Sequence, residues 1–223
     1  LGYGFTRQRN GAAAMHAVSC LPSITGAWQH RGGGALYSNG GLYGLNTRAL
    51  YGLDAVTPDT RVLDMGRLGA VLAGERRDLG DGPPVMAMLM QNANSANVAP
   101  DSAAVARGLA REDLFLCVHE QFMTATARFA DIVLPSAWFY EKHDMTFSTV
   151  GNPFYAYIDR SVEPPGECKE EWAAMALIMK KIGERAKARG MVDFVDNSGA
   201  KRRFEDLWAS FTMNGHIQSN EDC

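Results

Sequence analysis

Residues 85–134 decide the fold, and they read VMAMLMQNANSANVAPDSAAVARGLAREDLFLCVHEQFMTATARFADIVL. Three apolar stretches occur there, at 85–90, 114–118 and 131–134. Each is bounded by polar or turn-forming residues, which is typical of strands buried on both faces. Asp101 can cap a helix over 103–109, and we expect a brief helix over 124–130. This alternation of strand and helix predicts an α/β fold with a Rossmann-like, three-layer parallel sheet.

Composition limits the class of protein. The chain has 223 residues, 46% hydrophobic and 21% charged, which suffices for one or two domains with a buried core. Its formal net charge of −3 gives no argument for nucleic acid, and no apolar run approaches the roughly 18 to 20 residues that cross a bilayer. We therefore expect neither nucleic acid nor a membrane as a partner.

The four cysteines lie far apart and form no C-x-x-C pair, so the sequence predicts no zinc or iron–sulfur cluster. This pattern favours a reducing compartment. We expect a cytoplasmic location, or a periplasmic one if this sequence is part of a longer protein that carries an export signal.

Residues 1–53 form a segment that is both glycine-rich and basic. They hold 11 of the 23 glycines and four arginines, but no acidic residue. Bare backbone and positive charge suit a phosphate-bearing ligand, whereas a surface loop with incidental arginines would have the same composition. Within the segment, residues 11–21 have a helix pattern that Pro22 is expected to end.

The remaining chain is predicted to have two further parts. Residues 54–165 contain a short helix at 65–72 and the predicted sheet, and we interpret them as a Rossmann-like dinucleotide-binding domain. Residues 166–223 are expected to be a helical extension. Apolar residues recur there at helical spacing over 170–189, and a short helix is predicted over 204–211.

Polar side chains follow the first two strands directly. Asn92 and Asn94 follow the first strand, and His119 and Glu120 follow the second. Ligands of parallel sheets bind beyond the carboxyl ends of the strands, where amides and carboxylates can bind ribose hydroxyls or a guanine edge. The alternative is turn chemistry for the asparagines and a solvated carboxylate for the glutamate. Lys142 could neutralise a phosphate or be an ordinary surface lysine.

Several common motifs are absent from the sequence. His119 and Glu120 do not begin an H-E-x-x-H zinc motif, because Met123 occupies the place of the second histidine. The sequence also contains no G-x-G-x-x-G, P-loop or G-x-S-x-G motif. A nucleotide site would therefore have to be built without these fingerprints.

Residues 114–142, LFLCVHEQFMTATARFADIVLPSAWFYEK, resemble the signature of the dimethyl sulfoxide reductase family of molybdopterin oxidoreductases. In that family a strand ends in an acidic residue, and an F-x-T-x-T-A helix leads to A-D-x-V-L-P and an acidic-Lys/His segment. Two other stretches are similar to family segments: GYGFTRQRNG followed by LPSITGAWQHRGGGALYSN, and QNANSANVAPD. The resemblance runs in the family's order from Tyr3 to about Trp172.

The resemblance implies an oxidoreductase that holds molybdenum or tungsten between two molybdopterin guanine dinucleotides, the bis-molybdopterin guanine dinucleotide cofactor. The residues that would face one pterin or its pyrophosphate are Tyr3, Gly4 and Arg7. Those that would hold a guanosine are Asn94, His119 and Glu120, with Lys142 and Glu170 completing the pocket. Thr124 would offer a hydroxyl and a helix N-terminus to phosphate.

Two departures from the family limit what the resemblance implies. The usual Asn-Pro is Asn94-Ser95 here, which keeps the amide. The family's metal ligand lies upstream of the matched region, and its C-terminal dinucleotide-binding domain lies downstream. We therefore expect an internal fragment that forms one side of the dinucleotide site, has no catalytic residue or metal ligand of its own, and is inactive without the rest of the parent chain. The alternative is a free-standing nucleotide-binding module or a catalytically silent scaffold.

Overall fold

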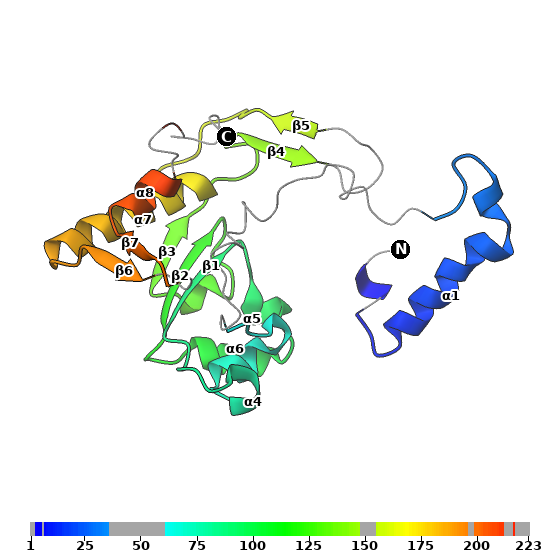
Figure 1. Ribbon diagram of the computed structural model, residues 1–223, viewed down its shortest axis with the longest axis horizontal. Helices are drawn as coiled ribbons and strands as arrows, with labels where there is room; N and C mark the ends of the chain where they lie inside the picture. The colour runs from blue at the N-terminus through cyan, green and yellow to red at the C-terminus, as the bar shows by residue number, and fades with distance from the viewer. Residues whose placement is uncertain are drawn as a thin grey trace. The chain divides into compact units, whose positions relative to one another are not determined.

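The computed structural model describes residues 3–5, 7–35, 61–147, 155–195, 199–211 and 216. The chain divides into two compact units, one of residues 1–45 with 147–156 and one of residues 46–146 with 157–223. Figure 1 shows the elements of both units. The expected boundary between residues 53 and 54 lies outside the described residues, and the expected boundary at residue 165 stays a prediction.

A three-stranded parallel sheet lies in the second unit, as the sequence predicts (Figure 1). Its strands, in the order in which they pair, are β1 Ala87–Gln91, β2 Phe115–Glu120 and β3 Ile132–Pro135. Gln91 of β1 is in register with His119 of β2, which is in register with Leu134 of β3. All three strands therefore end at one edge of the sheet, which we call the carboxyl edge.

One face of this sheet is buried under short helices. Those involved are α3 Leu68–Leu72, α5 Ser95–Val98 and α6 Ser102–Leu109, the last two connecting β1 to β2. Leu116 and Val118 of β2 are fully buried against Leu72 and Val105 from these helices. Asp101 caps α6 as predicted, because its Oδ1 accepts a hydrogen bond from the N–H of Ala104 at 3.1 Å.

The opposite face of the sheet is covered unevenly. Leu89, Phe115 and Ile132 keep 47%, 49% and 45% of their surface exposed. At the carboxyl end of the same face, His119 lies beside a cavity of about 400 Å³ that residues of helix α7, Glu171–Ala188, also line. Helix α7 therefore covers the carboxyl end of this face.

The first unit contains the helix α1 Gly11–Ile24 between two 3-10 turns, η1 Tyr3–Phe5 and η2 Ala27–Gln29. The prediction that Pro22 ends α1 is wrong, because Pro22 lies inside the helix. A proline in the last turn removes one backbone donor. The helix still ends with a regular hydrogen bond, which the N–H of Thr25 donates to the carbonyl of Leu21 at 2.9 Å.

Two other helix predictions are corrected in detail. The segment 124–130 forms only the 3-10 turn η5 Ala127–Phe129, and the segment 65–72 is divided into η4 Met65–Arg67 and α3. In the first case Oγ1 of Thr124 accepts from the N–H of Ala127 at the start of the turn, and the hydroxyl of Thr126 bonds to the N–H of Ala96 in the loop after β1. A further short helix is α4 Arg76–Leu79.

The chain after β3 contains strands as well as helices. The pair β4 Asp144–Phe147 and β5 Tyr155–Ile158 forms a two-stranded sheet. After α7, the strands β6 Asp193–Val195 and β7 Lys201–Arg203 pair antiparallel, and α8 Asp206–Phe211 follows. The extension that was expected to be helical thus also contains a strand pair. Within the described parts of the chain, no helix is long and apolar enough to span a membrane.

Candidate functional site

The loops that follow β1 and β2 are joined through the buried hydroxyl of Thr126. Oδ1 of Asn94 accepts hydrogen bonds from the N–H of Thr126 at 3.2 Å and from its hydroxyl at 3.0 Å. The hydroxyl oxygen in turn accepts a bond from the N–H of Ala96 at 2.9 Å. Asn94 therefore holds the two loops together through Oδ1, while its Nδ2 has no hydrogen-bond partner among the residues that the structure describes.

Glu120 and Thr124 keep hydrogen-bonding capacity at the carboxyl edge. Oε1 of Glu120 accepts from the N–H of Gln121 at 2.8 Å, and Oε2 has no partner within the described ranges. Oγ1 of Thr124 accepts from the N–H of Ala127 at 3.2 Å, which leaves the hydroxyl hydrogen available. Both side chains are partly exposed. This edge can therefore both donate hydrogen bonds to a ligand and accept them from it.

His119 is fully buried and is bonded within the protein at both ring nitrogens. Nδ1 lies 3.4 Å from the amide nitrogen of Gln91, and Nε2 lies 3.1 Å from the carbonyl oxygen of Lys169. Because the amide nitrogen is a donor, Nδ1 accepts and Nε2 carries the hydrogen given to Lys169. The N–H of Lys169 also donates to the carbonyl of Pro135 at 3.1 Å. His119 thus fixes the segment before α7 to the carboxyl edge.

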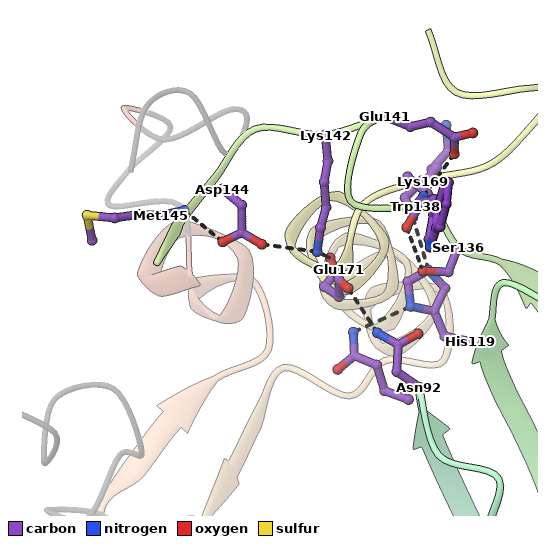
Figure 2. A network of polar contacts seen from close by, with 12 residues as sticks. Asn92, His119, Ser136, Trp138, Glu141, Lys142, Asp144, Met145, Lys169 and Glu171 are labelled. Carbon is purple, nitrogen blue, oxygen red and sulfur yellow. Dashed lines mark hydrogen bonds and ion pairs between the residues drawn. The ribbon is translucent and has the colours of Figure 1, made fainter. Parts of the chain in front are cut away.

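The ammonium group of Lys142 is held by two carboxylates (Figure 2). Its Nζ lies 2.7 Å from Oε2 of Glu171 and 3.3 Å from Oδ2 of Asp144. Oε1 of Glu171 accepts from Nδ2 of Asn92 at 3.0 Å. Asn92 follows β1 with a positive φ of 49°, which asparagine tolerates better than most residues, and its N–H donates to the carbonyl of His119 at 3.0 Å. This network connects the end of β1 to the first turn of α7.

The ion pair keeps both of its members charged. Burial alone would lower the pKa of Lys142, but the hydrogen bond to Glu171 and the charges of Glu171 and Asp144 outweigh it and raise that pKa above 10.5. Burial alone would raise the pKa of Glu171, but the bonds from Lys142 and Asn92 lower it below 4.5. The network is therefore charged across the neutral range.

The structure places the expected site residues of the second unit at the carboxyl edge or next to it, and their roles stay predictions. Glu170, which is expected to complete the pocket, is the N-cap residue of α7, and the next residue, Glu171, binds Lys142 and Asn92. Glu171 was not predicted from the sequence as a member of this network, although its place in the first turn of the predicted helix was a usable signal. Tyr3 and Gly4 lie in η1 of the first unit, with Arg7 shortly after them.

The charge of the carboxyl edge is more negative than positive. Seven residues at this edge are together called the edge group: Asn92, Asn94, Glu120, Thr124, Lys142, Asp144 and Glu171. Three of its members are carboxylates and one is a cation, so it favours ligand groups that donate hydrogen bonds, such as hydroxyls and ring N–H groups. In the described residues, no cluster of three or more His, Cys, Asp or Glu side chains could hold a metal ion.

Comparison with known proteins shows which family the chain is similar to. The family model described as molybdopterin oxidoreductase matches residues 1–181. A probable oxidoreductase, YoaE of Bacillus subtilis (strain 168), is 36% identical over 184 residues, which cover 82% of this chain and 26% of the relative. The dimethylsulfide dehydrogenase subunit alpha of Rhodovulum sulfidophilum is 35% identical over 111 residues, which cover 50% of this chain and 12% of the relative.

Among solved structures, acetylene hydratase from Pelobacter acetylenicus is similar, with 28% identity and a TM-score of 0.41 over 56% of this chain and 15% of that one. The chain spans about a quarter of the length of the B. subtilis relative. Strands β6 and β7 and helix α8 lie beyond the residues that match the family model.

Proposed function

Since the chain belongs to the molybdopterin oxidoreductase family, we propose that it is part of a molybdenum- or tungsten-dependent oxidoreductase and forms one side of the binding site for a molybdopterin guanine dinucleotide. The remainder of the parent chain would form the other side and supply the metal ligand. When bound, the bis-molybdopterin guanine dinucleotide cofactor would supply the metal centre at which electrons are exchanged. This chain's own residues would bind and orient the nucleotide end.

One observation carries the proposal: side chains of the edge group keep unused hydrogen-bonding capacity at the carboxyl edge. These are Nδ2 of Asn94, Oε2 of Glu120 and the hydroxyl of Thr124, each unpartnered within the described residues. In a Rossmann-like sheet this edge is where nucleotides bind, and we interpret the β1-β2-β3 sheet in that way. The donor set fits a guanosine, which offers both hydrogen-bond donors and acceptors.

The proposal assigns different roles to the residues carried over from the family resemblance. Asn94, Glu120 and Thr124 would contact the nucleotide, with Asn94 also fixing the two loops. His119 would act indirectly, because it is fully buried and holds Lys169 in place. The roles of Tyr3, Gly4 and Arg7 toward a pterin or its pyrophosphate rest on the resemblance alone.

The test uses the full-length parent protein, produced in a host that makes the cofactor. Pterin fluorescence after oxidative release and metal analysis would report cofactor content. Glu120→Ala removes a hydrogen bond to a charged acceptor, which costs about 1.5 to 3 kcal/mol, so the variant should lose cofactor on dilution. Glu112→Ala, at an exposed position shortly before β2, is the matched control.

Two outcomes would contradict the proposal. If the Glu120→Ala variant retains its cofactor in full, the carboxylate of Glu120 does not contribute to the binding site. A parent protein that binds guanine nucleotides but holds no pterin would favour the free-standing nucleotide-binding module instead.

A further inference from the structure

A cavity of about 700 Å³ lies between the second half of helix α7 and the elements that follow it. Its lining comes from α7, from the turn after it, from β7 and from α8, which packs against α7 (Figure 1). Except for Met179 and Lys180, the described lining residues all follow residue 181, where the match to the family model ends. The edge group contributes no residue to this lining, so a ligand bound here would have a role beyond the proposed function.

One wall of the cavity consists of large apolar side chains. We call these residues the apolar wall: Met179, Met191, Val192, Phe204 and Trp208. Met191, Val192 and Trp208 keep 49%, 56% and 37% of their surface exposed. Methionine is unbranched and polarizable, so a wall with two methionines can adapt to ligands of different outline. Apolar side chains that stay exposed around a hollow of this size are typical of a small-molecule site, for which volumes of roughly 300 to 1,000 Å³ are usual.

Backbone hydrogen bonds hold the apolar wall in place. The N–H of Met191 donates to the carbonyl of Ala186 at 2.9 Å, which fixes the turn after α7. The N–H of Phe204 donates to the carbonyl of Val192 at 3.0 Å, and its ring lies 4.8 Å from the ring of Phe194 between centroids. The wall is therefore formed without a ligand, which limits the cost of ordering it on binding.

The carboxylates that line the cavity already have cationic partners. Glu184 forms an ion pair with Nζ of Lys181 at 2.8 Å, and Glu205 forms one with the guanidinium group of Arg203. Neither carboxylate is therefore left to balance a further positive charge in full.

Two lysines of α7 line the cavity as well, and one of them has no anionic partner. The pKa of Glu184 is lowered first by its hydrogen bond with Lys181 and to a smaller extent by the charge of Lys180, so part of the charge of Lys180 is balanced. The ammonium group of Lys187 has no ion pair or hydrogen bond among the residues that the structure describes. The cavity thus combines an apolar wall with an ammonium group that lacks a carboxylate.

We propose that this cavity binds a small amphiphilic anion, with its apolar body against the apolar wall and its anionic group paired with Lys187. A neutral apolar ligand would leave the charge of Lys187 unbalanced, and a small inorganic anion would leave the wall exposed to water. Aliphatic and aromatic carboxylic acids both have the required chemistry.

The first experiment titrates the 223-residue chain, labelled at its methionine methyl groups, with octanoate and with 2-naphthoate, and follows the methyl signals by NMR. We expect at least one of the two acids to shift the signals of Met179 and Met191. Met65 is the internal control, because it is 88% exposed and does not line the cavity. If neither acid shifts Met179 and Met191, or if Met65 shifts as much as they do, the proposal is wrong. The two acids also distinguish an aliphatic from an aromatic source of the ligand.

The second experiment tests the anionic group with Lys187→Gln. This variant should weaken octanoate binding about 2- to 5-fold, the range for an ion pair at an exposed site, and should leave 1-octanol binding unchanged. Arg185→Gln is the matched control, because Arg185 is an exposed cation on the same helix that does not line the cavity. Equal weakening of octanoate by both variants would assign the effect to net charge and would overturn the pairing with Lys187.

The third experiment tests the apolar body by filling the cavity. A Cβ at Gly183, which lines it, would lie 3.3 Å from the carbonyl oxygen of Phe204, and a leucine there would extend into the space of the ligand. Gly183→Leu should weaken the acids about 10-fold or more, because their apolar body is no longer buried. Circular dichroism checks the fold. If this variant does not fold, Met191→Gln, which places a polar group in the apolar wall, should weaken octanoate and 1-octanol alike, followed at Met179. Affinities that stay unchanged in the folded variant would overturn the proposal.

Discussion

Thr126, in the loop after β2, is fully buried, and its hydroxyl forms hydrogen bonds with Asn94 and Ala96 in the loop after β1. Thr126→Val keeps the shape of the side chain but leaves the N–H of Ala96 and Oδ1 of Asn94 each one hydrogen bond short. We expect a loss of about 1 to 3 kcal/mol in the free energy of unfolding, measured by urea denaturation. Thr126→Ser keeps the hydroxyl and is the control for the hydrogen bonds. A Thr126→Val variant that is as stable as the unmodified chain would contradict the hydrogen-bonding argument.

Glu171 gives a prediction about pH. Its pKa is lowered in the folded chain, so its contribution to stability is present above about pH 4.5 and is lost as the pH falls through the folded value. Glu171→Gln should therefore be less stable than the unmodified chain at pH 7, and the difference should shrink below about pH 4.5. Urea denaturation at several pH values would measure it. A difference that stays constant down to pH 3 would contradict the ion pair.

At the residue scale, the sequence predicted which polar side chains lie at the carboxyl edge, but not which hydrogen bonds and ion pairs they form there. Asn94 and Glu120 could be identified because both stand at the ends of apolar strands. Glu170 was named from the family resemblance, and its role in the pocket stays a prediction, whereas the bonds of the next residue, Glu171, to Lys142 and Asn92 could not be predicted from the sequence. The burial of His119 could not be predicted either, because its partner, the carbonyl of Lys169, lies 50 residues away.

Helices α3 and α6 pack so closely that a glycine is required at their contact. A Cβ at Gly69 would lie 2.7 Å from the Cβ of Ala104. Alanine is the better helix former by about 1 kcal/mol, yet we expect Gly69→Ala to destabilise the chain by about 1 to 3 kcal/mol through overpacking. Gly183→Ala in α7 is the control, since its nearest atom, the carbonyl oxygen of Phe204, is 3.3 Å away. Thermal unfolding would compare the two, and equal melting temperatures would contradict the packing argument.

At the scale of elements, the parallel sheet could be predicted because each strand lies in a continuous apolar stretch. The expectation that the strands are buried on both faces is wrong for much of one face, where Leu89, Phe115 and Ile132 stay about half exposed. The apolar stretches at 85–90, 114–118 and 131–134 correspond to β1, β2 and β3 within a few residues. The pair β6–β7 was not predicted, because its strands have three residues each and β7 is entirely basic. Such a short strand depends on its pairing partner and has no periodicity of its own.

At the scale of the whole molecule, we expect the isolated chain to carry no molybdenum or tungsten and to catalyse no redox reaction. Metal capture needs the dithiolenes of two pterins and a protein ligand that converge on one point. Cys20, Cys117 and Cys168 are free thiols in α1, in β2 and before α7, respectively.

Elemental analysis of the chain, purified from a host that makes the cofactor, would test this together with a dye-linked reductase assay. The full-length parent protein is the positive control. Stoichiometric metal with measurable turnover would show that the chain contains a complete metal site.

The contacts of Lys169 also affect how the chain folds during synthesis. Strand β3 ends at Pro135, and Lys169, which pairs beyond that strand and receives the hydrogen bond from His119, follows about 34 residues later. At roughly 5 to 20 residues per second, the ribosome needs about 2 to 7 s to add this stretch. During that interval the backbone at the end of β3 lacks its hydrogen bonds to Lys169 and His119 lacks its partner at Nε2, so these groups can pair with a neighbouring nascent chain. Slower translation between codons 135 and 169 should therefore increase the insoluble fraction.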